Sequence, residues 1–294
     1  MASFCRQDYN CNIIMSVRSV NIIVLNWNQK DLSLKCISSL EKTVYKDKHI
    51  VFVDNGSIDG SVESVKRLHP NVEIIELENN LGYAAGNNAG FSMISKKSKY
   101  TIFLNNDTFV DSSFIEPLID ELEDNTLSIQ AVPKIFYAQE KGKVWYAGGD
   151  INLTLSQIRH IGIRSSNIEK YNKRLTVDYA TGCCFCIRSD DFTRFGMFDE
   201  NYKMYCEDVD LSLKISNNGG QIAYIPNSKV WHHVSMSLGG SNSYSKWSKK
   251  QLSILRLILK HGRLILLPIS IISYFINASL SFMFISILKI TKKR

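Results

Sequence analysis

Short apolar runs alternate with helical patterns over the first hundred residues, and this alternation constrains the fold more than any other feature of the chain. The runs cover residues 20–25, 49–53, 72–77 and 100–104, and apolar residues at helical spacing separate them. This order is typical of parallel strands joined by helices in an α/β protein. We therefore expect a mostly parallel central sheet flanked by helices.

Polar clusters follow these apolar runs where the strands are expected to end. They are residues 26–28, 54–57, 79–82 and 105–107. Because ligands bind at the carboxyl ends of parallel strands in open α/β sheets, we expect these clusters to form one site. Asp107, at the end of the fourth run, is a natural ligand for a divalent cation at such an edge.

Beyond this region the pattern changes. A helix is expected over 113–124, strands and loops dominate 129–190, and two short helices lie within 188–218. An acidic group, residues 207–210, opens the second of these helices. Carboxylates at a helix N-terminus stabilise its dipole, and this is the role expected of Asp210.

The segment 264–288 contains 25 residues without a charge, and it follows a basic amphipathic helix expected over 246–261. At about 1.5 Å per residue, a helix of this length could cross a bilayer core about 30 Å thick. Both flanks are basic, so the positive-inside rule would place one flank on the wrong side of the membrane. An interfacial or re-entrant arrangement keeps both flanks cytosolic, and a buried core helix is the alternative.

The cations of the chain are concentrated around this segment. The formal net charge is +7, while six basic residues lie between 246 and 263 and four more among the last six residues. The remainder is therefore slightly acidic, which argues against a nucleic-acid partner and for a membrane surface with anionic lipid. The odd count of seven cysteines and the lack of a continuous apolar core in residues 1–18 favour a reduced, cytosolic protein.

Eight short motifs stand in a fixed order along the chain. They are residues 20–28, 53–57, 80–90, 104–107, 180–182, 198–200 and 207–211, followed by a His-x-x-x-x-Ser spacing from His232 to Ser237. In this combination the chain resembles the family 2 glycosyltransferases with the GT-A fold. The branch it is most similar to is that of the rhamnosyltransferases of bacterial surface polysaccharide synthesis.

The resemblance covers about residues 18–245 and implies three parts. Residues 1–18 would be an N-terminal extension, and residues 19–245 a single GT-A catalytic domain. Residues 246–294 would form the basic amphipathic helix and an apolar, membrane-associated tail.

The resemblance also implies a nucleotide-sugar donor at the predicted sheet edge. Leu25 and Asn26 would line the nucleotide pocket, and Asp54 would accept a hydrogen bond from the N3–H of uracil or thymine. The segment 80–90 would carry the nucleotide, with glycines that let the backbone approach the donor closely. Its candidate donor-binding residues, with those of the next strand end, are Asn80, Gly82, Gly86, Asn88, Asn105 and Asn106.

Residues 105–107 would stand for the Asp-x-Asp element that holds a divalent cation in this family. Asn105 and Asn106 depart from that pattern and leave Asp107 as its only acidic ligand. The cofactor, Mg²⁺ or Mn²⁺, would then be held largely by the donor's diphosphate. His232 would complete the coordination, and His233 is the less favoured ligand because the His-x-x-x-x-Ser spacing starts one residue earlier.

Asp208 would be the general base of an inverting transfer. A carboxylate would take the proton of the acceptor hydroxyl while that oxygen attacks the anomeric carbon from the face opposite the nucleotide. Glu207 would orient the acceptor, and Thr181 and Gly182 would shape the pocket between donor and acceptor.

The implied function is transfer of a sugar, with rhamnose favoured, from a UDP or dTDP donor to a hydroxyl of a lipid-linked saccharide. The transfer would take place at the cytoplasmic face of the cell membrane, and a membrane-bound acceptor would explain the apolar tail. One alternative, a nucleotidyltransferase, would carry a Gly-rich basic loop after the first strand, where this chain has residues 26–29. The other is a catalytically silent GT-A-like binding or scaffold protein of a polysaccharide assembly complex, which would have lost Asp107, Asp208 or His232.

Overall fold

The computed structural model describes residues 18–202, 204–234 and 244–291. Three features of the sequence lie outside the described residues. They are residues 1–17 of the predicted N-terminal extension, Ser237 of the His-x-x-x-x-Ser spacing, and the last three basic residues.

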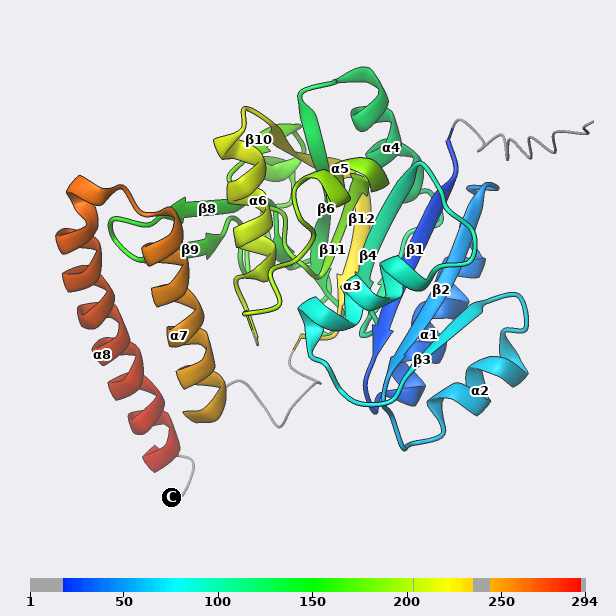
Figure 1. Cartoon of the computed structure of the whole chain (residues 1–294), viewed down its shortest axis with the longest axis horizontal. Coiled ribbons are helices and arrows are strands. Elements are labelled where there is room, and N and C mark those ends of the chain that lie inside the picture. The colour runs from blue at the N-terminus through cyan, green and yellow to red at the C-terminus, as the bar shows by residue number, and fades with distance from the viewer. Residues whose placement is uncertain (1–17, 203, 235–243, 292–294) are drawn as a thin grey trace, which may run out of the picture.

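Ten strands of the described chain form one central sheet (Figure 1). In chain order they are β1 (Val20–Asn26), β2 (Lys48–Asn55), β3 (Glu73–Leu77), β4 (Tyr100–Asn105), β5 (Thr108–Val110), β6 (Ser128–Tyr137), β7 (Val144–Tyr146), β10 (Leu175–Val177), β11 (Cys184–Arg188) and β12 (Gln221–His232). The order across the sheet is β10-β12-β6-β11-β4-β1-β2-β3, with β5 paired to β12 and β7 to β6. Strands β4, β1, β2 and β3 run parallel, as do β6 and β12, while β11 is antiparallel to both its neighbours.

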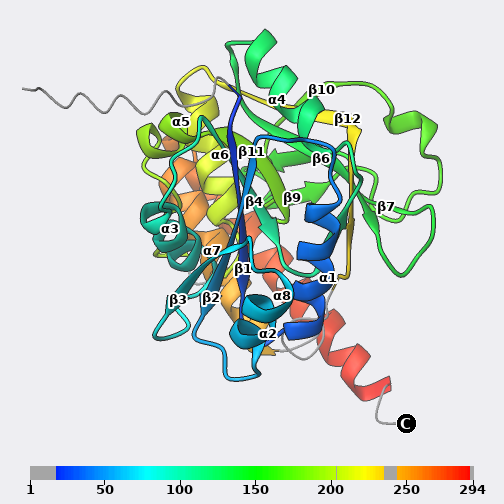
Figure 2. The same cartoon turned by 90° about the vertical axis from the view of Figure 1, so that its right-hand side faces the viewer.

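Helices cover both faces of the sheet. They are α1 (Lys30–Glu41), α2 (Ser61–Leu68), α3 (Tyr83–Met93), α4 (Ile115–Asp124), α5 (Ser189–Arg194), α6 (Glu207–Asn217), α7 (Tyr244–His261) and α8 (Leu267–Thr291), with 3-10 turns η1 (Glu169–Tyr171) and η2 (Leu264–Leu266). Neighbouring residues at the end of β1 point to opposite faces: Leu25 lies against Gly86 of α3, and Asn26 accepts a hydrogen bond from Ser33 of α1. Figure 2 shows α1 and α3 on the two sides of β1 and β2.

The predicted α/β class with a mostly parallel sheet and flanking helices is confirmed. Each predicted strand and helix of the first hundred residues is present, and the bounds differ by a few residues at most. The pattern succeeded here because β1 is buried on both faces and reads as one apolar run. A separate two-stranded hairpin, β8 (Gly149–Asn152) with β9 (Gln157–His160), lies beside the sheet.

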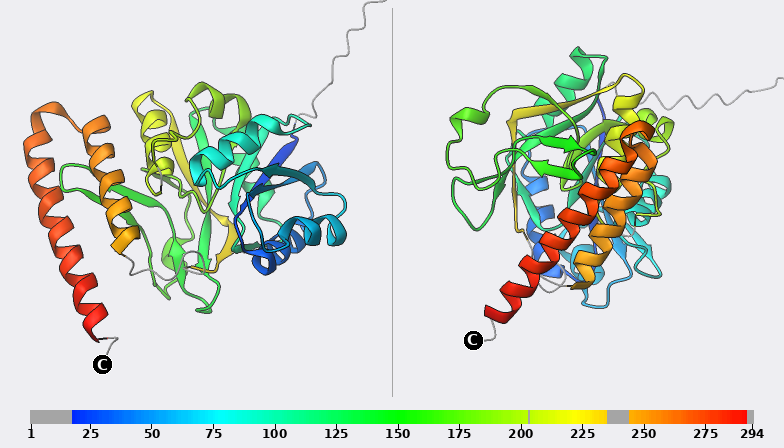
Figure 3. Two further views of the ribbon diagram at one scale, coloured as in Figure 1. Left: turned by 60° about the horizontal axis from the view of Figure 1, so that its bottom comes forward. Right: turned by 90° about the vertical axis from the view of Figure 1, so that its left-hand side faces the viewer.

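Helices α7 and α8 form an antiparallel hairpin at one end of the molecule (Figures 1 and 3). Trp247 Nε1 donates to Ser281 Oγ at 2.8 Å, and the hydroxyls of Tyr244 and Ser286 lie 3.2 Å apart. The start of α7 therefore lies beside the end of α8. The stretch Leu264–Ile287 is long and apolar enough to cross a membrane, and only 17% of its most apolar window is buried, so it is not a core helix.

Candidate active site

The carboxyl ends of β1, β2 and β4 meet at one edge of the sheet, as predicted. Strand pairing places Asn26 opposite Asp54 and Leu25 opposite Asn105. The Nδ2 group of Asn26 donates to Asp54 Oδ1 at 2.9 Å, and Nδ2 of Asn106 donates to Asn26 Oδ1 at 3.0 Å. Side chains of one polar network therefore tie three strand ends together.

Asp54 is fixed at this edge as a hydrogen-bond acceptor. Its side chain is buried, and its second carboxylate oxygen accepts the backbone N–H of Ser57 at 2.8 Å. Each carboxylate oxygen has two acceptor sites, so each keeps one for a further donor. This geometry is compatible with the predicted hydrogen bond to a pyrimidine N3–H, which stays a prediction.

Asn106 is more committed to the protein than the sequence suggested. Besides its bond to Asn26, its Nδ2 group donates to Ser33 Oγ of α1 at 2.9 Å. Both amide hydrogens are used beneath α1, so only the amide oxygen is left for a donor nucleotide. The neighbouring Asn105 is partly exposed at the end of β4, and its backbone N–H donates to Cys183 O at 2.9 Å.

Asn55, which the sequence did not single out, clamps the loop before α3. Its Nδ2 group donates to Asn80 Oδ1 at 3.0 Å and to the carbonyl oxygen of Gly82 at 3.2 Å. Its Oδ1 accepts the backbone N–H of Leu81 at 2.9 Å. The available signal was its place directly after Asp54, where β2 ends.

Two glycines of α3 have a packing role. A Cβ atom on Gly90 would lie 2.5 Å from a methyl carbon of Val53, and one on Gly86 would lie 2.9 Å from a methyl carbon of Leu25. The two glycines are therefore needed to seat α3 on β1 and β2, a packing role that the sequence did not indicate, and their predicted approach to a donor stays a prediction. Gly82 differs, since its φ of +85° is a conformation that side chains rarely adopt.

Asn88 also serves the structure of the protein. Its Nδ2 group donates to the carbonyl oxygen of Phe198 at 2.9 Å and to Glu200 Oε1 at 3.0 Å, and its Oδ1 accepts the Phe198 N–H at 3.2 Å. The side chain is buried. In place of the predicted donor contact, Asn88 ties α3 to the motif at 198–200.

Asp107 and His232 come together although 125 positions separate them in the chain, because β5, directly after Asp107, pairs with the end of β12. His232 Nε2 lies 3.1 Å from Asp107 Oδ1, and both side chains are buried. The backbone N–H of His233 donates to the Asp107 carbonyl oxygen at 2.8 Å. The short approach of the His232 ring is compatible with the predicted choice of His232 over His233 as a ligand, which stays a prediction.

These two side chains fit a shared divalent cation. The Nδ1 atom of His232 is buried without a hydrogen-bond partner among the described residues, while its Nε2 atom faces Asp107. The described residues contain no group of three His, Cys, Asp or Glu that could hold a metal ion. Mg²⁺ commonly takes one or two protein ligands and completes its shell with substrate phosphates and water, which is what this pair allows.

Asp208 lies in the first turn of α6 and faces the loop between β10 and β11. Its Oδ2 accepts the backbone N–H of Gly182 at 2.7 Å, and its Oδ1 accepts the N–H of Val209 at 2.8 Å. Burial raises the pKa of the Asp208 carboxyl against the opposing effect of these hydrogen bonds. The turn before it is strained, because Tyr205 and Cys206 have φ values of 68° and 70°.

Glu207 is buried directly beside Asp208. Its Oε2 atom has no hydrogen-bond partner among the described residues. Burial, followed by the charge of Asp208, raises the pKa of the Glu207 carboxyl. An uncompensated carboxyl group of this kind costs stability, and such groups cluster at functional sites.

Tyr83 joins α3 to the loop that contacts Asp208, and the sequence did not single it out. Its hydroxyl donates to the carbonyl oxygen of Gly182 at 2.5 Å, on the same glycine whose N–H holds Asp208. A Cβ atom on Gly182 would lie 3.0 Å from the Tyr83 hydroxyl oxygen and 3.4 Å from Asp208 Oδ2. The close fit explains why a glycine stands at this predicted pocket position.

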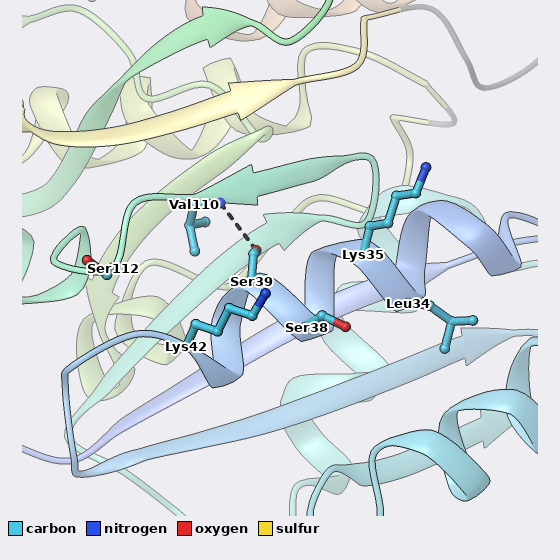
Figure 4. A pocket seen from close by; sticks show the side chains of 7 residues that line it. All are labelled: Leu34, Lys35, Ser38, Ser39, Lys42, Val110 and Ser112. Atoms are coloured by element: carbon cyan, nitrogen blue, oxygen red, sulfur yellow. Dashed lines mark hydrogen bonds between the residues drawn. The ribbon is translucent and has the colours of Figure 1, made fainter.

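A groove of about 460 Å³ runs along the outer side of α1 (Figure 4). It is lined by Leu34, Lys35, Ser38, Ser39, Lys42, Val110 and Ser112. The Ser39 hydroxyl accepts the backbone N–H of Val110 at 3.2 Å. None of the predicted site residues lines this groove, so it is separate from the strand-end site.

The sequence model of glycosyl transferase family 2 matches residues 21–196, from β1 to the loop after α5. The chain belongs to the family 2 glycosyltransferases. It is a glycosyltransferase, so the nucleotidyltransferase and silent-scaffold alternatives are set aside. The matched span includes Asp107 and the strand ends with Asn26, Asp54 and Asn106, which we call the donor edge after its predicted role. Asp208 and His232 lie beyond the matched span.

Relatives of this glycosyltransferase include rhamnosyltransferases. The N-acetylglucosaminyl-diphospho-decaprenol L-rhamnosyltransferase of Mycobacterium tuberculosis is 24% identical over 225 residues, which are 69% of this chain and 72% of that protein. Rhamnosyltransferase WbbL of Escherichia coli K12 is 36% identical over 76 residues, 25% of this chain and 29% of WbbL. The minor teichoic acid biosynthesis protein GgaA of Bacillus subtilis is 29% identical over 160 residues, 53% of this chain and 33% of GgaA. The predicted rhamnosyltransferase-like branch is confirmed.

Two solved structures share the fold of this glycosyltransferase. GalNAc-T7, crystallised with UDP, GalNAc and Mn²⁺, superposes with a TM-score of 0.66 at 18% identity, over 82% of this chain and 47% of that one. TarS of Staphylococcus aureus gives 0.55 at 15% identity, over 82% of this chain and 40% of that one. The predicted GT-A fold is therefore confirmed.

Proposed function

We propose that this glycosyltransferase inverts the anomeric centre as it moves a sugar from a dTDP or UDP donor to a hydroxyl of a lipid-linked saccharide. The observation that carries the proposal is the placement of Asp208. Its carboxylate is half-buried, accepts the N–H of Gly182, and is joined through that glycine and Tyr83 to α3, the helix that follows the predicted donor loop.

The chain's own residues divide the work between binding and proton transfer. Asp54 accepts the pyrimidine N3–H, and the Asn55 clamp holds the loop 80–82 against the nucleotide. Asp208 accepts the proton of the acceptor hydroxyl while that oxygen forms a bond to the anomeric carbon. The bond from that carbon to the diphosphate oxygen breaks, and the nucleoside diphosphate leaves with the electron pair.

Asp107 and His232 would hold a Mg²⁺ or Mn²⁺ ion together with the donor's diphosphate. The bound ion would supply positive charge to the leaving diphosphate. The 3.1 Å approach of the two side chains supports this role, as does the Mn²⁺ in the crystals of GalNAc-T7. Glu207, next to the base, orients the acceptor.

Rhamnose is the proposed sugar and a lipid diphosphate saccharide the proposed acceptor. The Mycobacterium tuberculosis relative is named for both, and it covers most of this chain. The apolar stretch Leu264–Ile287 supports a place at the membrane, which we assign to the cytoplasmic face. Residues 19–245 would then form the catalytic domain and residues 246–294 its membrane-associated part.

The test is a donor panel with the full chain. The protein is incubated with dTDP-rhamnose and with other dTDP- and UDP-sugars, each with a lipid-diphosphate N-acetylglucosamine acceptor, and the product is identified by mass. We expect release of nucleoside diphosphate that depends on the acceptor, and a product one deoxyhexose heavier. Transfer from a purine-nucleotide sugar alone would contradict the role of Asp54, and transfer with retained configuration would contradict the mechanism.

A further inference from the structure

Several polar groups of α8 contact the rest of the protein. Asn277 Nδ2 donates to the Leu155 carbonyl oxygen at 2.7 Å, and the Ser270 carbonyl oxygen accepts the Ser156 hydroxyl at 3.1 Å. Ser281 and Ser286 contact α7, as described above. One side of α8 is therefore committed to the β8–β9 hairpin and to α7.

The opposite side of α8 is apolar and exposed. Its exposed residues, each more than half accessible to solvent, are Ile269, Ile272, Phe275, Ile276, Leu280, Met283, Phe284 and Ile287, and Leu264 and Ile265 precede them in η2. An apolar surface of this extent on a water-soluble domain marks an interaction site.

One side of α7 is exposed as well, and it mixes cations with leucines. Lys249, Leu252, Arg256 and Leu259 recur at helical spacing and are exposed, whereas Leu257 on the other side is fully buried. Exposed cations of this kind attract anionic headgroups, and the exposed leucines beside them can enter the boundary of the acyl chains.

We propose that the α7–α8 hairpin binds in the plane of a bilayer that contains anionic lipid, and that α8 does not span it. The start of α7 is fixed beside residues 281–286 of α8 through Tyr244 and Trp247. If α8 crossed the membrane in this arrangement, Lys249 and Lys250 would enter the hydrocarbon, where an unpaired charge is strongly disfavoured. In the interface the same two cations attract anionic headgroups.

This inference rests on the proposed function only for the presence of a membrane. The full chain is sedimented with vesicles of phosphatidylcholine, with and without phosphatidylglycerol, and the pellets are washed with alkaline carbonate. We expect binding that requires phosphatidylglycerol and release by carbonate. Retention after carbonate would show spanning, and failure to bind either vesicle would also overturn the proposal.

A paired variant tests the surface itself. The double substitution Ile272→Ser with Phe275→Ser should weaken vesicle binding by at least about 10-fold, since two exposed apolar side chains no longer enter the interface. The matched control is Ile58→Ser, which changes an isoleucine that is 93% exposed on a loop remote in sequence. Turnover of a soluble acceptor should stay unchanged in both variants. If the double variant instead dissolves a dimer of the full chain and leaves vesicle binding intact, the surface belongs to a second copy.

A buried ion cluster carries a second, independent inference. Asp210 is fully buried in the first turn of α6, two residues after Asp208. Lys260 Nζ and His261 Nε2, both at the end of α7, lie 2.8 and 2.7 Å from its carboxylate, and Lys214 of α6 lies 3.2 Å from it. The predicted role of Asp210 in the helix dipole is therefore incomplete, because α7 is attached through it.

Two further contacts attach the end and the middle of α7 to the same region. Lys260 Nζ also lies 2.8 Å from Asp199 Oδ2, and the Ser253 hydroxyl donates to the Met204 carbonyl oxygen at 2.8 Å. These contacts sit on the loop that leads into the strained turn before Asp208. We infer that Lys260 and His261 are positioning residues, which hold the first turn of α6 in the geometry that Asp208 needs.

Steady-state kinetics with a soluble acceptor test this inference. Lys260→Ala and His261→Ala each leave two of the three partners of Asp210 in place, so the fold should persist, and a thermal melt sets an assay temperature at which both variants are folded. We expect kcat to fall by about 10-fold or more while the donor KM stays constant, because small displacements of a catalytic group have large effects. Lys260→Arg should restore kcat, and Lys249→Ala on the exposed side of α7 should leave it unchanged. An unchanged kcat, or a loss that Lys260→Arg does not restore, would overturn the inference.

Discussion

The donor edge and the first turn of α6 satisfy their buried polar groups in opposite ways. At the edge, the side-chain amide of Asn106 bonds that of Asn26, and the amide of Asn55 bonds the loop before α3. The Asp54 carboxylate accepts one hydrogen bond from the Asn26 amide and one from the backbone N–H of Ser57. In α6, carboxylates are buried, and Glu207 has an oxygen without a described partner. The first arrangement suits a preformed binding surface, while the second is expensive in a purely structural turn and indicates chemistry.

Substitution of Asp208, the proposed base, should have the largest effect of the changes considered for the two regions. Asp208→Asn keeps an oxygen that can accept the Gly182 N–H but removes the proton acceptor. Transfer should fall by about 10²–10⁴-fold, as is typical when a general base is lost. Steady-state rates measure it, and a variant that retains more than a tenth of wild-type activity would remove Asp208 from the role.

Removal of the divalent cation proposed to bind Asp107 and His232 should have the next largest effect. A chelator should stop transfer, and Mg²⁺ or Mn²⁺ should restore it. His232→Ala should raise the metal concentration that gives half-maximal activity by about 10–100-fold, since Asp107 and the diphosphate would remain as ligands. His233→Ala is the matched control. Full activity in a metal-free assay would contradict the assignment of Asp107 and His232.

A third prediction concerns the packing that supports the donor edge. Gly90→Ala should lower the free energy of unfolding by about 1–3 kcal/mol, because the new methyl group would overlap Val53. Denaturant unfolding of the two proteins measures the difference. Gly142→Ala separates the overlap from backbone strain, since a Cβ there would meet open space while its φ of +74° disfavours a side chain. A neutral Gly90→Ala substitution would show that α3 can move away from β2.

The smallest expected effect concerns the pH dependence of stability near the base. The pKa of the Glu207 carboxyl is raised in the folded protein, so its contribution to stability is present below the ordinary Glu pKa and is lost as pH rises through the raised value. Glu207→Gln should therefore raise Tm relative to wild type at mildly alkaline pH. The difference in Tm between Glu207→Gln and wild type should become smaller as pH falls. A difference that grows as pH falls would contradict a raised pKa for Glu207.

The donor edge was the more predictable region, because its residues follow strands that the hydrophobic pattern locates. Strand pairing alone brings Asn26 opposite Asp54. The sequence could not separate side chains that face a donor from those that face the protein, so Asn88 and Gly86 were assigned to the donor and serve packing. That distinction depends on contacts such as Asn88 with Phe198, which span 110 positions.

The α6 region depended still more on distant contacts. The acidic group was visible at once, but the attachment of Asp210 to Lys260 and His261 was not, because the partners lie about 50 positions away and were assigned to a membrane-facing helix. Tyr83 was missed for the same reason, since its partner Gly182 lies 99 positions along the chain. Local pattern therefore located the motifs, and tertiary packing decided their roles.

The proposed division of roles, with donor binding at Asp54 and proton transfer at Asp208, is tested most directly by a donor titration by calorimetry with two variants. Asp208→Asn should bind dTDP-rhamnose, or the donor identified in the panel, with wild-type affinity and should not transfer it. Asp54→Ala should lose about 10-fold or more in affinity for the donor, because one charge-assisted hydrogen bond is removed. Loss of donor binding in Asp208→Asn together with unchanged binding in Asp54→Ala would contradict the account.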